Sequence, residues 1–158
     1  MAHAKQIYLT YWRELKLFID DRGLDWTFSS FEGENEAVVK IGSPGCKICL
    51  SLIGADTKNP KNLIMASFWI PDSKELFERL KANRIKVEAE MGKALVWDSQ
   101  PGRKSCWVRI KSVMDLSDPK NWPLSFEWFA ENAQKIRDIC HRFSDALPLQ
   151  KTGTMRRF

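Results

Sequence analysis

Two cysteines three residues apart, Cys46 and Cys49, are the residues whose types and spacing first suggest chemistry. Such a pair can hold zinc when a tight turn brings both sulfurs to one ion. It can act as a redox pair at a helix N-terminus, where the helix dipole lowers a thiol pKa. The surrounding CKICLSLI instead alternates like a β-strand, which places the two side chains on opposite faces. We therefore predict structural cysteines and no metal site; convergent sulfurs would restore the metal or redox alternative.

A second candidate is the strand-like segment KSCWVRIK, residues 104–111, with the turn before it. Period-two alternation directs Cys106 and its alternate neighbours toward a core and the remaining side chains outward. An exposed Trp between cations suits nucleic acid, because the ring stacks on bases while the cations meet phosphates. The candidate nucleic-acid-binding residues are Arg103, Lys104, Trp107, Arg109 and Lys111. In the alternative, a helix covers this face and Trp107 belongs to the core.

The net charge of +5, with a pI of about 9.1, is concentrated in two segments, 93–111 and 147–158. A localised basic region favours an anionic partner, and DNA or RNA is the first candidate. Ordinary solvated surface charge is the alternative.

The elements that must position these residues follow the order α-β-β-β-α-β-β-α. This order predicts an α+β fold with about five strands, a mostly antiparallel sheet and three helices. The third strand is apolar on both faces, which predicts a central position with both faces covered. Residues 24–35 are expected to form a loop. The helices are expected at residues 4–22, from 72 or 73 to 91, and 122–143; the strands at 37–41, 46–53, 63–70, 94–98 and 104–111.

Size and composition predict one globular domain, residues 1–147, with a basic flexible tail, residues 148–158. We find no signal-peptide pattern and no apolar run that could span a bilayer, so we expect a cytoplasmic protein without a membrane partner. The common nucleophile, phosphate-loop and metalloprotease motifs are missing from the sequence. We accordingly assign no catalytic residue and no cofactor.

The element order also matches the core order of PD-(D/E)XK nucleases, which need a metal-binding Asp and a Glu-x-Lys. Asp56 lies late, in a loop, and the third strand holds no Glu-x-Lys. Glu36 and Lys40 flank the first strand at the wrong spacing. If the fold is related, the catalytic set looks lost.

Three segments together resemble a known family: YWREL at 11–15, PDSKELFERLKANRIKVEAEMGKALVW at 71–97, and NWPLSFEWFAENAQKIRDICHRF at 121–143. The pattern, over about residues 7–145, is similar to a bacterial and archaeal domain family of unknown function. Its members often follow a PD-(D/E)XK endonuclease-like domain. The resemblance implies an accessory or recognition domain in DNA metabolism or defence, and it brings no catalytic set with it.

The sequence therefore predicts a non-enzymatic recognition domain that binds nucleic acid or a protein partner, such as a nuclease. Two alternatives stay open. One is a protein-interaction or oligomerisation module whose surplus aromatic residues form an interface. The other is a divergent nuclease-like enzyme with a degraded active site. The oligomeric state is left unassigned.

Overall fold

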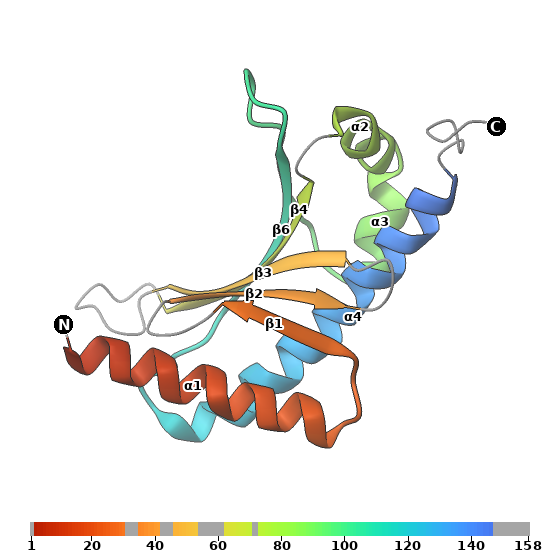
Figure 1. The fold of residues 1–158 in the computed structure, drawn as a ribbon. Coiled ribbons are helices and arrows are strands. Elements are labelled where there is room, and N and C mark those ends of the chain that lie inside the picture. Colours follow the sequence, from red (N-terminus) through yellow and green to blue (C-terminus); the bar gives the residue numbers. More distant parts are fainter. Residues whose placement is uncertain (1, 31–34, 42–45, 54–61, 71–72, 147–158) are drawn as a thin grey trace.

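The computed structural model describes residues 2–30, 35–41, 46–53, 62–70 and 73–146. Within these ranges, six antiparallel strands form one sheet in the order β1-β2-β3-β4-β6-β5, accompanied by four α-helices (Figure 1). The predicted α+β class and antiparallel sheet are confirmed. None of the described helices is long and apolar enough to cross a membrane.

The helices are α1 (Ala2–Asp21), α2 (Lys74–Ala82), α3 (Arg84–Met91) and α4 (Trp122–Ala146), with a short 3-10 turn at Pro119–Asn121 before α4. The strands are β1 (Trp26–Ser30), β2 (Glu36–Ile41), β3 (Cys46–Ile53), β4 (Leu63–Ile70), β5 (Val96–Asp98) and β6 (Cys106–Val113). Strands β2, β3 and β4 form the expected meander, and β5 and β6 form the expected hairpin.

Two elements differ from the prediction. Strand β1 occupies part of the expected loop and pairs with β2, with Trp26 opposite Ile41. Trp26 and Phe28 alternate with Thr27 and Ser29, so the sequence did carry a strand signal, but over four residues only. The expected long helix is divided at Asn83, whose side-chain amide donates to the carbonyl of Arg79 at 2.9 Å. Asparagine competes with the helix for backbone groups in this way, so α2 ends and α3 begins there.

The described helices all pack against the same face of the sheet. In Figure 1, α2, α3 and α4 lie together on one side of the upright strands β4 and β6. Strand β4 is central, between β3 and β6, as predicted. The expectation that both its faces are covered is wrong, because Met65 and Trp69 remain partly exposed while Ile64, Ala66 and Phe68 are buried.

Helices α1 and α4 are joined by a buried aromatic cluster around Tyr11, which is 1% exposed. Its ring makes edge-on contacts with Trp122 and Phe126, at centroid distances of 5.2 and 5.0 Å. The hydroxyl lies 2.6 Å from Ser125 Oγ. Because Ser125 Oγ donates its own proton to the Trp122 carbonyl, Tyr11 is the donor to Ser125. Burial raises the pKa of Tyr11, so the phenol stays neutral.

We predict that Tyr11→Phe lowers the free energy of unfolding by about 1 kcal/mol, because it removes one buried hydrogen bond and keeps the ring. Tyr11→Ala should cost about 3–5 kcal/mol, since the ring's packing is lost as well. Urea denaturation followed by circular dichroism measures both values. An equal decrease in the free energy of unfolding for the two variants would show that packing of the Tyr11 ring does not hold α1 and α4 together.

Candidate functional site

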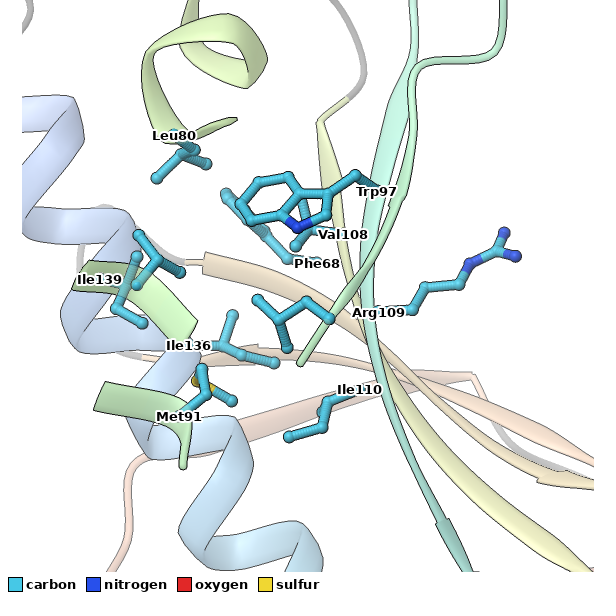
Figure 2. Close-up of a pocket in the computed structure, with 11 residues that line it drawn as sticks. Phe68, Leu80, Met91, Trp97, Val108, Arg109, Ile110, Ile136 and Ile139 are labelled. Atoms are coloured by element: carbon cyan, nitrogen blue, oxygen red, sulfur yellow. The ribbon is translucent and has the colours of Figure 1, made fainter. Parts of the chain in front are cut away.

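The sheet face opposite the helices, here called the open face, carries the candidate site. Figure 2 shows the two sides of β6 near α2, α3 and α4: Val108 and Ile110 point into an apolar pocket shared with Ile136 of α4. The side chain of Arg109 extends from the same strand in the opposite direction. Consecutive residues of β6 therefore serve different surfaces, as the pleat of a strand requires.

Burial along β6 follows the predicted alternation. Cys106 is fully buried and Val108 is 7% exposed, whereas Trp107 and Arg109 are partly exposed and Lys111 is exposed. The outward direction of the candidate strand residues is thus confirmed. The alternative of a helix over this face is wrong for the described part of the chain, because its helices pack against the other face.

Two tryptophans from neighbouring strands form the centre of the open face. Pairing of β4 with β6 sets Trp69 directly opposite Trp107. Their ring centroids lie 6.1 Å apart and the ring planes differ by 32°. Lys47 Nζ is 4.4 Å from the centre of the Trp69 ring, and Arg109 Cζ is 4.9 Å from the centre of the Trp107 ring. Each aromatic ring therefore has a cation on it.

This pair stands apart from the other tryptophans of the chain. The remaining five belong to the hydrophobic core or pack against its edge: Trp12, Trp26, Trp97, Trp122 and Trp128. Trp69 and Trp107 are partly exposed and lie outside that core. Two large apolar rings that contribute nothing to the core need another reason to be there.

A groove crosses the open face from β2 to the turn between β5 and β6. It encloses about 760 Å³ of space continuous with solvent. Its floor and walls come from every strand between those limits. The lining residues are Glu36, Val38, Lys47, Cys49, Trp69, Gln100, Arg103, Ser105 and Trp107.

Cys49 lies on the groove side of β3 and is 8% exposed. Burial raises the pKa of its thiol, and the nearby Glu36 carboxylate adds to this effect. A thiol kept protonated in this way is a poor nucleophile and a poor metal ligand. Among the described residues, no group of three or more His, Cys, Asp or Glu could hold a metal ion. The side chain of Cys46 is outside the described part of the structure.

The turn after β5 is fastened to α2 by one lysine. Lys74 Nζ donates to the carbonyls of Ser99, Gln100 and Ser105, the last two at 3.3 and 3.4 Å. Ser105 Oγ also donates to Gln100 Oε1 at 2.7 Å. These bonds hold Gln100 at φ 47°, a backbone conformation that a non-glycine residue adopts only with support. The turn therefore presents Arg103 at the groove from a fixed backbone.

The structure brings only part of the predicted set together. Arg103 and Trp107 line the groove, and Arg109 lies against Trp107. Lys104 is exposed in the turn, and Lys111 is exposed four residues along β6 from Trp107; neither lines the groove.

The groove also contains residues that the sequence analysis did not select, namely Glu36, Lys47, Trp69 and Gln100. For Trp69 a signal was available: the polar Ser67 marks one face of an otherwise apolar strand, and Trp69 shares that face. Glu36 and Lys40, considered for a nuclease, are both exposed on β2. Asp56 lies outside the described residues.

Comparison with known families matches residues 7–143 to the domain of unknown function DUF4268. The chain belongs to this family. The match covers nearly the same residues as the resemblance drawn from the sequence, and it confirms membership of a family without an assigned function. No protein with a curated description and no solved structure matches the chain.

We predict that Lys74→Met loosens the turn between β5 and β6, because three carbonyls lose their shared donor. Backbone amides of residues 99–105 should exchange with deuterium about tenfold faster, as measured by mass spectrometry. Lys16→Met is the matched control, since Lys16 pairs with Asp20 at an exposed position on α1. Unchanged exchange in Lys74→Met would show that the turn holds its shape without this lysine.

Proposed function

We propose that this protein is a non-enzymatic recognition domain whose open face binds single-stranded nucleic acid. The observation that carries the proposal is the Trp69–Trp107 pair, which lies outside the core with a cation on each ring. Proteins that bind single strands combine aromatic stacking surfaces with cations that follow the phosphates. The open face offers both within one groove.

The energetics favour unpaired bases as the occupant. Stacking of one base on an aromatic side chain contributes about 1–3 kcal/mol, and every base has a flat face to offer. Bases in a duplex are already stacked on each other, so they gain little from a tryptophan on a sheet. The two rings lie on adjacent strands, which suits successive bases of a flexible strand laid across the sheet. Lys47 and Arg109 would then exchange ring contacts for contacts with phosphates.

The charge of the open face agrees with an anionic ligand. Only two carboxylates, Glu36 and Asp98, lie on its described strands. The cations on these strands and on the adjoining turn are Lys40, Lys47, Arg103, Lys104, Arg109 and Lys111. Such an excess attracts a polyanion and raises its rate of association.

The family resemblance drawn from the sequence supports a place in DNA metabolism or defence. Members of the family that the sequence resembles often follow a nuclease-like domain. A protein partner is the competing occupant, because exposed aromatic rings also anchor protein interfaces. A divergent nuclease is the third candidate. Metal-dependent DNA cleavage that is abolished by Asp56→Ala would favour it over the recognition domain.

We predict that Trp69→Ala and Trp107→Ala each weaken binding of a 12-nucleotide single strand by about tenfold or more, through lost stacking. Fluorescence anisotropy measures the affinity, and thermal unfolding verifies that each variant is folded. Trp128→Ala is a matched control: this ring packs against the core beside Phe129, away from the open face. Wild-type affinity in the Trp69→Ala, Trp107→Ala double variant would refute the proposed site.

We further predict a steep dependence of this affinity on salt, because phosphate contacts release counterions. The Lys47→Gln, Arg103→Gln variant, which removes the two cations that line the groove, should reduce the slope of log K against log salt concentration by about 1.4, at about 0.7 for each lost cation. Arg84→Gln with Lys86→Gln serves as the control, since both cations are exposed on α3. A salt-insensitive complex with the single strand would show that the cations of the open face do not contact its phosphates.

A further inference from the structure

The sheet holds the two tryptophans of the open face at a set separation. Trp69 of β4 lies directly opposite Trp107 of β6, and neighbouring strands are about 4.8 Å apart. The ring centroids are farther apart than the strands, at 6.1 Å, and the ring planes are inclined by 32°. The open face therefore offers two stacking surfaces whose spacing is set by strand pairing.

The strand register continues the row of the tryptophans toward β2. Lys47 of β3 follows Trp69 in this row, because Ile48 pairs with Phe68, and its Nζ lies 4.4 Å from the centre of the Trp69 ring. Lys40 of β2 lies opposite Lys47. A nucleic-acid strand that crosses the sheet along this row would meet both rings in succession and then two cations.

The separation of the rings decides what the bound strand must do. Successive bases of a stacked strand lie about 3.4 Å apart. Two successive bases that cover Trp69 and Trp107 must instead follow ring centres that are 6.1 Å apart. They then lose contact with each other, because attraction between two flat rings needs atoms about 3.5–4 Å apart. Occupation of both rings therefore opens one base step of the strand.

We infer that the open face selects single strands by how easily they unstack, and that it binds thymine or uracil strands more tightly than adenine strands. This inference rests on the function proposed above. Adenines stack on each other more strongly than thymines or uracils do, so opening a step costs an adenine strand more. Preferences of this kind come from stacking strength and backbone flexibility, and no base edge is read by hydrogen bonds.

The selection requires both rings. A stacked strand has one free base face at each of its ends, and this face can cover a single ring while every step stays closed. Removal of Trp107 therefore removes the need to open a step, although the strand still binds weakly to Trp69 and the cations. The larger face of a purine then favours adenine on the remaining ring.

The test compares 12-mers of deoxythymidine, deoxyuridine and deoxyadenosine at constant salt by fluorescence anisotropy. We expect the wild-type protein to bind the deoxythymidine strand about fivefold tighter or more than the deoxyadenosine strand, equivalent to about 1 kcal/mol. The deoxyuridine strand should bind within about twofold of the deoxythymidine strand, since both stack weakly. In Trp107→Ala the preference for deoxythymidine over deoxyadenosine should fall to about twofold or less, or reverse.

Trp128→Ala is the matched control, because this ring packs against the core beside Phe129 and its loss should leave the preference unchanged. Equal wild-type affinity for the deoxythymidine and deoxyadenosine strands, with binding still dependent on Trp69 and Trp107, overturns this inference and leaves the proposed function intact. An undiminished preference in Trp107→Ala, or rejection of deoxyuridine, also overturns it. Binding that does not depend on the two tryptophans overturns the inference and the proposed function together.

Discussion

One-sided burial of the sheet is the constraint on which the rest of this structure depends. Apolar side chains of β2, β3, β4 and β6 point to the same face, and α4 packs against β3 and β4 there. Each fully buried aliphatic side chain contributes about 1.5–3 kcal/mol, so this layer accounts for much of the stability. The ion pair Arg22–Glu127 links the turn after α1 to α4, and Arg142–Glu90 links α4 to α3, but both pairs are exposed and add little.

Because the core is complete on one side, the opposite face is free to carry polar and aromatic groups. Small residues, Ser51 and Ser67, lie low on it at 2% exposure, while Trp69 and Trp107 stand above them. The long side chains of Lys47 and Arg109 lie over the rings and shield part of each ring from water. A partly exposed aromatic pair is costly to keep in water, which is why we assign it a role in binding.

The groove and the helical layer are connected through Lys74 at the start of α2. Its contacts with three turn carbonyls fix the rim that holds Gln100 and Arg103. A second link joins α3 to β5: Glu88 accepts from the Leu95 amide and from Trp97 Nε1, at 2.9 and 3.0 Å. The backbone and indole bonds together lower the pKa of Glu88. The rim of the groove is therefore set by the same helices that cover the core.

The sequence alone determined which residues share a face, because side chains alternate strictly along a strand and recur at helical spacing in α4. Cys106 and Trp107 were assigned to opposite sides correctly on that basis. Only the tertiary structure decided which face the helices leave open, since either face of a strand can be covered. It also set Trp69 beside Trp107, two residues far apart in the chain that meet through the register of β4 and β6. Local periodicity carries no information about that pairing, so the groove emerged only from the fold.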